Sequence, residues 1–208
     1  DRSGSTESFW PEMINCVKEI VNACKNSPSV DNLLLRMATF SGDVEEFHGF
    51  KLFEACDLSD YDTLFSGQGG MTALYDAVAD AGEALLTYGS HLYRSDFSVN
   101  GILFVITDGL ENDSRKCNLS HVVEAVHKPI IKETLESLVS ILIGVNIIDP
   151  SVGAALSFFR QEVGFTQYIE LKDAQANTLS RLARFVSRSI SSQSRNLGTG
   201  SASTPLSF

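Results

Sequence analysis

The chain has 208 residues, which is enough for one sizeable domain that buries a hydrophobic core without a disulfide or zinc staple. Its 43% hydrophobic and 20% charged residues exclude a wholly disordered protein. The net charge of −10 argues against nucleic acid as the main ligand. Four of the sixteen basic side chains and none of the acidic ones lie after residue 180. No apolar run reaches about 18 residues, so no membrane span is predicted.

The cysteines indicate the compartment. Cys16, Cys24, Cys56 and Cys117 form no CxxC pair and have no zinc-site spacing with the histidines. We therefore expect reduced, partly buried thiols in a cytoplasmic protein, with two disulfides as the alternative. Whether a signal peptide precedes residue 1 is left open by the sequence.

Apolar spacing predicts the elements of the first part of the chain. A helix of about 15 residues opens near Phe9, because apolar residues recur there at helical intervals. Strands over 33–40 and 44–53 flank a Ser-Gly-Asp turn and form an antiparallel hairpin at a sheet edge. A polar loop over 56–70 leads to a second helix, whose apolar face runs from Leu74 to Leu85.

The rest of the chain alternates strands with helices. Strands are predicted over 102–106, 138–145 and 167–171, and helices over 120–135 (interrupted at Pro129), 151–163 and up to about residue 190. This order predicts an α/β fold with one doubly wound, mostly parallel open sheet, one antiparallel edge strand and helices on both faces. The domain spans 1–190, and the Ser/Gly/Thr-rich residues 191–208 form a flexible tail or linker.

Oxygen-bearing side chains gather where strands end and helices begin. In open α/β sheets these positions share one edge, where ligands bind. Singly, each hydroxyl is explained equally well as a residue that starts or caps a helix. Together they offer two carboxylates and three hydroxyls, the oxygen donors that Mg²⁺ prefers. The candidate metal residues are Asp1, Ser3, Ser5, Thr72 and Asp108.

These motifs resemble the metal-ion-dependent adhesion site of von Willebrand factor A domains. The resemblance rests on Asp1-x-Ser3-x-Ser5, on the Gly-x-Thr loop at Thr72 and on the Thr-Asp-Gly-x-Glu-Asn run at 107–112, in that order. It covers about 1–190 and is greatest to small bacterial members.

The resemblance implies how the metal is bound. Ser3, Ser5 and Thr72 would coordinate Mg²⁺ (or Mn²⁺ or Ca²⁺), while Asp1 and Asp108 would act mainly through bound water. Gly70, Glu111 and Asn112 would form the rim that a partner touches.

Two features depart from the family. Thr6 stands where the family often has Met. The family's first strand, in the middle of its sheet, directly precedes the first motif, which here begins at Asp1. We therefore expect a first central strand of five to seven apolar residues upstream of residue 1.

The resemblance favours a binding module that is not an enzyme. Its Mg²⁺ would be completed by an Asp or Glu of a protein partner. The alternatives are a Mg²⁺-dependent hydrolase of phosphatase type, or a structural part of a phage or secretion particle with a vestigial site.

Three further features have simpler explanations. Asp76 is expected to face solvent or a helix neighbour. Arg181, Arg184 and Arg188 are expected late in a helix, where cations favour its dipole. The glycine run before Met71 lacks the Gly-Lys-Ser/Thr ending of a phosphate loop.

Overall fold

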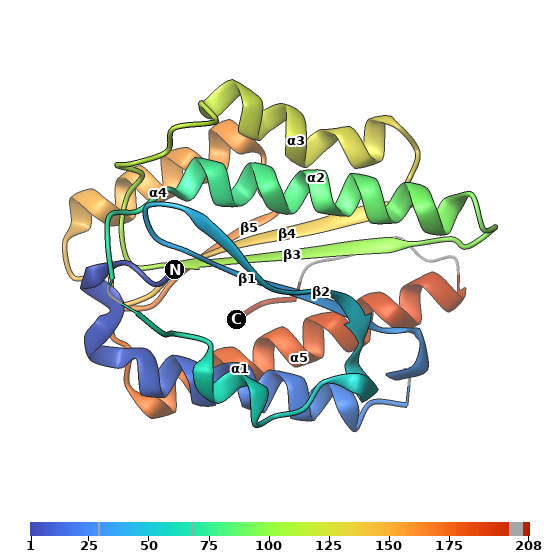
Figure 1. Cartoon of the computed structure of the whole chain (residues 1–208), viewed down its shortest axis with the longest axis horizontal. Helices are drawn as coiled ribbons and strands as arrows, with labels where there is room; N and C mark the ends of the chain where they lie inside the picture. Colours follow the sequence, from blue (N-terminus) through green and yellow to red (C-terminus); the bar gives the residue numbers. More distant parts are fainter. Residues whose placement is uncertain (29, 68, 200–205) are drawn as a thin grey trace.

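The computed structural model describes residues 1–28, 30–67, 69–199 and 206–208. Its strands form two separate sheets (Figure 1). The first is the antiparallel pair of β1 (Leu34–Phe40) and β2 (Val44–Leu52). The second is parallel, in the order β3 (Asn100–Thr107), β4 (Ser137–Gly144), β5 (Gln167–Glu170). The α/β class and the hairpin are confirmed, but the prediction of one doubly wound, mostly parallel sheet is wrong.

The break between the sheets lies between β1 and β3. Within the described residues β1 pairs with β2 alone, and β3 pairs with β4 alone. Only their carboxyl ends are bridged: the Asp1 α-amino group donates to the Ile106 carbonyl at 2.9 Å, and the Arg2 N–H donates to the Phe40 carbonyl at 2.7 Å. A continuous sheet needs backbone hydrogen bonds along neighbouring strands, and here a strand to supply them is missing from the described chain. The first central strand expected upstream stays a prediction.

Helices cover the strands from two sides (Figure 1). On one side lie α1 (Trp10–Lys25), which follows the 3-10 turn η1 (Gly4–Phe9), and α5 (Ala176–Thr199). On the other side lie α2 (Leu74–Tyr93), α3 (Leu119–Ile131) and α4 (Pro150–Val163). Three further 3-10 turns, η2 (Val30–Asn32), η3 (Phe53–Ala55) and η4 (Asp60–Thr63), lie in the connections around β1 and β2.

Two hydrophobic cores result, one on each side of the strands. Alternation along β3 explains them: Leu103 and Val105 are buried in the core under α2 and α3, whereas Phe104 is half-buried against the core of α1 and α5. In β4 the side chains of Ile141 and Leu142 are fully buried, one in each core. The buried strands thus position the loops that follow their carboxyl ends.

Two helices differ from their predicted bounds. The last one, α5, continues to Thr199, past Ser191 where the predicted tail begins. Helix α3 passes through Pro129 and ends two residues later, because a proline near the end of a helix removes only one late hydrogen bond.

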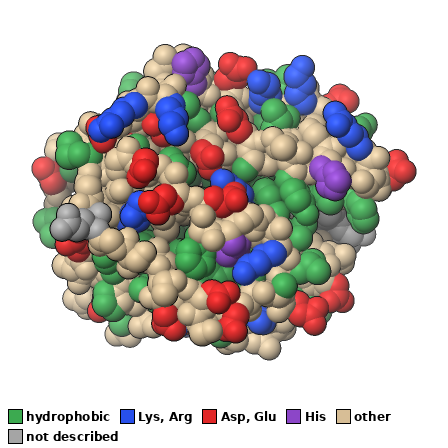
Figure 2. Space-filling model, in the orientation of Figure 1, with side chains coloured by type: hydrophobic (Ala, Val, Ile, Leu, Met, Phe, Trp, Pro, Cys, Tyr) green, Lys and Arg blue, Asp and Glu red, His purple; other side chains and the backbone are tan. Residues whose placement is uncertain are grey.

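The outer surface mixes charges of both signs. On the face shown in Figure 2, acidic and basic side chains are interspersed, and hydrophobic side chains gather near the middle. Among the described residues, no helix is both long and apolar enough to cross a membrane.

Candidate metal centre

The Asp1 carboxylate holds the first loop against the end of β3. Its Oδ1 accepts a hydrogen bond from the Ser3 N–H at 2.7 Å, and its Oδ2 accepts one from the Thr107 hydroxyl at 2.6 Å. The first bond bends the backbone so that Ser3 and Ser5 both face the strand end. Asp1 therefore acts as a clamp between two segments more than 100 positions apart.

Four of the five predicted metal residues are joined by this network. The hydroxyls of Ser3 and Ser5 lie 3.1 Å apart, and the Ser5 hydroxyl donates to Asp108 Oδ1 at 2.9 Å. Burial raises the pKa of the Asp108 carboxyl above its usual value, although the bond from Ser5 acts the other way. A divalent cation beside Asp108 would reverse this effect, because it favours the charged carboxylate.

The glycine run brings a second loop onto the first. The Gly4 N–H donates to the Gly70 carbonyl at 3.0 Å, and the Gly69 N–H donates to Glu7 Oε1 at 2.9 Å. A Cβ atom at Gly69 would lie 2.6 Å from the Gly4 Cα, so a side chain there would collide with backbone. The glycines therefore serve close packing of the two loops.

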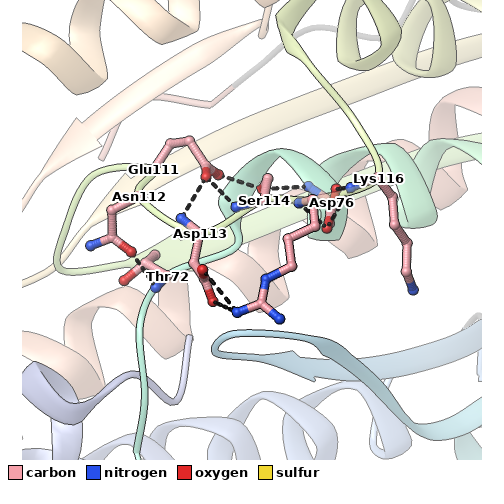
Figure 3. Close-up of polar contacts among 8 residues, drawn as sticks. Thr72, Asp76, Glu111, Asn112, Asp113, Ser114 and Lys116 are labelled. Carbon is pink, nitrogen blue, oxygen red and sulfur yellow. Dashed lines mark hydrogen bonds and ion pairs between the residues drawn. The ribbon is translucent and has the colours of Figure 1, made fainter.

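Thr72, the fifth predicted metal residue, is buried and held by the segment that follows Asp108. Its N–H donates to Asn112 Oδ1 at 2.7 Å, and its carbonyl accepts from the N–H groups of Asn112 and Asp113 at 3.0 and 3.3 Å (Figure 3). The structure thus ties the Thr72 loop to the Asp108 loop through its backbone, which leaves its hydroxyl for other partners.

Glu111, predicted as a rim residue, braces the same segment. Its carboxylate accepts a hydrogen bond from the N–H of Tyr75 at 2.8 Å. It also accepts bonds from both the N–H and the hydroxyl of Ser114, each at 2.6 Å (Figure 3). Gly70 and Asn112 are exposed. Contact of these three residues with a partner stays a prediction.

Asp76 braces the loop that follows Asn112 and Asp113, which the sequence analysis did not predict. Instead of facing solvent it is buried, and its carboxylate accepts from the N–H groups of Arg115 at 3.0 Å, Lys116 at 3.2 Å and Cys117 at 2.8 Å. Figure 3 shows the contact with Lys116. It lies one helical turn after Thr72, so it fixes the 115–117 segment to α2. In the sequence, the role of Asp76 is marked only by its place as an acid in the first turn of a predicted helix. Such a position usually indicates no more than a favourable interaction with the helix dipole.

A chain that starts at Asp1 would have a pH-dependent stability, because its α-amino group would be buried. Burial lowers its pKa from 8.0 to about 5, so the folded chain binds this proton less tightly than the unfolded chain. The free energy of unfolding should therefore rise from pH 5 to pH 8, by up to about 4 kcal/mol. Urea unfolding in EDTA measures it for a chain that starts at Asp1. An Nα-acetylated chain should show a smaller rise, and an equal rise in both chains would contradict the assignment.

The donor set suits a hard cation. Among the described residues, no group of three or more His, Cys, Asp or Glu side chains is placed to hold a metal. A group of that kind does not include hydroxyl oxygens. Ser3 and Ser5 supply two hydroxyls beside the carboxylates of Asp1 and Asp108, and Thr72 offers a third from the loop that follows Gly70. Such a set fits Mg²⁺, which binds few protein oxygens and keeps several waters.

Comparisons with known proteins show similarity at the level of fold. No family model and no curated protein matches the chain. Among solved structures, proximal thread matrix protein 1 from the mussel byssus is 18% identical, with a TM-score of 0.56 over 92% of this chain and 44% of its own. The D319A mutant of the PilB minor pilin from Streptococcus sanguinis is 10% identical, with a TM-score of 0.57 over 91% of this chain and 56% of its own. The chain spans about half the length of these structures, with which it shares the fold.

Proposed function

We propose that the chain is a divalent-metal-dependent protein-binding module. The observation that carries the proposal is the hydrogen-bonded series of oxygens from Asp1 through Ser3 and Ser5 to Asp108, at the carboxyl end of β3. Ser3, Ser5 and Thr72 would hold Mg²⁺, with Mn²⁺ or Ca²⁺ as substitutes, and Asp1 and Asp108 would orient its ligands. This is the von Willebrand factor A type of adhesion site, and we propose that family for the chain.

The chemistry of the ligands suggests how a partner is bound. Neutral hydroxyls remove less of the positive charge of the ion than carboxylates do, so the ion keeps its affinity for another anionic oxygen. An Asp or Glu of a protein partner would supply that oxygen. The chain's own residues hold the ion and orient the hydroxyls, and no bond of the partner is cleaved.

A Thr72→Ala variant should lose partner binding more than it loses stability. Thr72 is held mainly through its backbone N–H and carbonyl, which alanine keeps, so the substitution removes only the hydroxyl and one methyl group. The test is a pulldown from extracts of the source cells with wild type, Thr72→Ala and the exposed control Thr63→Ala, each in Mg²⁺ and in EDTA.

We expect one partner to be retained by wild type and by Thr63→Ala in Mg²⁺ only. Equal recovery under all conditions would reject the mechanism. Steady metal-dependent turnover of a phosphoester would favour a hydrolase instead.

We further propose a reducing compartment, the cytoplasm. The four cysteines are free thiols, and three of them are buried. Burial raises the pKa of Cys16 and of Cys24 to about 12, which makes these thiols poor nucleophiles for disulfide exchange. Thiol titration of the native protein from its source cells should give four reactive groups after unfolding without reductant, whereas fewer groups would indicate disulfides.

A further inference from the structure

The arginines of α5 form a basic face that the fold itself does not explain. Arg181, Arg184 and Arg188 are all exposed and lie at i, i+3 and i+7, on one side of the helix. Because α5 begins at Ala176 and runs to Thr199, all three lie well before its last turn. The helix dipole stabilises cations only near the carboxyl end of a helix, so it does not explain why arginines occupy these positions.

Among the described residues, these arginines also form no ion pair with an acid. Elsewhere Arg2, Arg36 and Arg115 each form ion pairs with carboxylates. Within the described residues, none of Arg181, Arg184 and Arg188 lies within ion-pair distance of an Asp or Glu. In a protein with a net charge of −10, three arginines gathered on one side of one helix form a local basic face that is complementary to an external acid.

An open groove of about 670 Å³ runs beside these arginines, between α1 and α5, and among the described residues its one acidic lining residue is Glu19 of α1. Its apolar walls include Phe208, whose ring lies 5.6 Å from that of Phe185 and 5.1 Å from the Arg181 guanidinium carbon. Phe208 is 40% exposed, so part of its ring is free for contact. Small alanines, Ala23 and Ala183, leave room along the floor.

We infer that this face binds a short acidic segment of a protein partner, with apolar side chains in the groove and carboxylates on Arg181, Arg184 and Arg188. The three arginines span about 10 Å of helix, which matches two or three carboxylates of a peptide. Arginine forks pair with carboxylates in bidentate geometry. A long polyanion such as DNA fits less well, because it would also lie over the acidic body of the molecule.

The test uses a fluorescently labelled ten-residue peptide of alternating glutamate and leucine, with fluorescence anisotropy as the readout. All titrations are done in EDTA, so the result is independent of the proposed metal-dependent function. A lysine–leucine peptide and a ten-nucleotide single-stranded DNA of the same length are the comparison probes. We expect the acidic peptide to bind most tightly and its affinity to fall as salt rises.

Two charge-reversal variants test whether peptide binding depends on this face of α5 or only on the net charge of the protein. Arg184→Glu with Arg188→Glu should weaken peptide binding at least about tenfold, whereas Arg94→Glu with Lys132→Glu, an equal charge change at exposed sites elsewhere, should weaken it less than about twofold. Phe208→Ala keeps every arginine and should weaken binding about threefold through lost apolar contact. Circular dichroism checks that each variant is folded.

Four results would overturn the inference. They are no saturable binding of the acidic peptide, equal losses in the two charge-reversal variants, tighter binding of DNA, or a dimer of the chain that the α5 variant dissociates. The last two would assign the face to a nucleic acid or to a second copy.

Discussion

Replacing Asp108 by alanine should abolish binding of Mg²⁺ while the fold survives. Asp108 follows the last residue of β3 and is only partly buried, so its loss removes a carboxylate from the loop and leaves both hydrophobic cores intact. It also removes the acceptor of the Ser5 hydroxyl, which then loses its orientation. Isothermal titration calorimetry should show one divalent site in the wild type and no saturable heat in the variant.

The exposed carboxylate Asp31 in η2 supplies the matched control. Asp31→Ala changes the net charge equally but lies outside the proposed centre, so it should bind Mg²⁺ like the wild type. Unchanged binding in Asp108→Ala would show that the cation, if one binds, lies elsewhere.

Replacing Asp76 by alanine should cost both stability and metal affinity. The three N–H groups of residues 115–117 would lose a charged acceptor beneath the surface, and hydrogen bonds to charged groups contribute roughly 1.5–3 kcal/mol each. Because partial hydration of the loop offsets some of this loss, we expect the free energy of unfolding to fall by about 3 kcal/mol in EDTA. Chemical unfolding followed by circular dichroism measures it.

The metal affinity should fall about tenfold in the same variant, since residues that position metal ligands typically matter to that extent. Glu83→Ala, an exposed acid on the same helix, should change stability by less than about 0.5 kcal/mol and leave the affinity unchanged. A stability loss without any change in metal affinity would mean that Asp76 supports the fold but not the site.

The sequence predicted the elements well because each is encoded locally. The continuous apolar run 102–106 in β3 and the largely apolar β4, in which Ser140 is the one polar interruption between Leu138 and Ile143, both appear in the residue pattern. The structure places these strands within one or two residues of the prediction. The bounds of α5 were harder, because Ser, Gln and Asn after residue 190 favour a helix only weakly and the pattern alone does not show that it continues.

The joining of strands into sheets was not encoded in the same way. The residues of β1 favour a strand whether or not a second strand pairs with its outer edge. The sequence of β1 therefore does not predict the break between β1 and β3. The expectation of one sheet came from the order of elements, which describes their sequence along the chain and not their hydrogen bonds.

The candidate site was predictable in its hydroxyls and carboxylates but not in its bracing. Short motifs place Ser3, Ser5 and Asp108 at one edge, and the structure joins them by hydrogen bonds. The roles of Asp76 and Glu111 depend on backbone N–H groups of a loop without regular structure, and no periodic pattern marks such contacts.

The central claim is that a bound metal ion keeps a position open for a partner's carboxylate. Its most direct test is water-proton relaxation of the chain loaded with Mn²⁺, titrated with N-acetyl-glutamate amide as the carboxylate and with N-acetyl-glutamine amide as the neutral control. We expect saturating carboxylate to displace about one fast-exchanging water from the bound ion, and the neutral control to displace none. Unchanged relaxation with both compounds, at a site that binds Mn²⁺, would contradict the account.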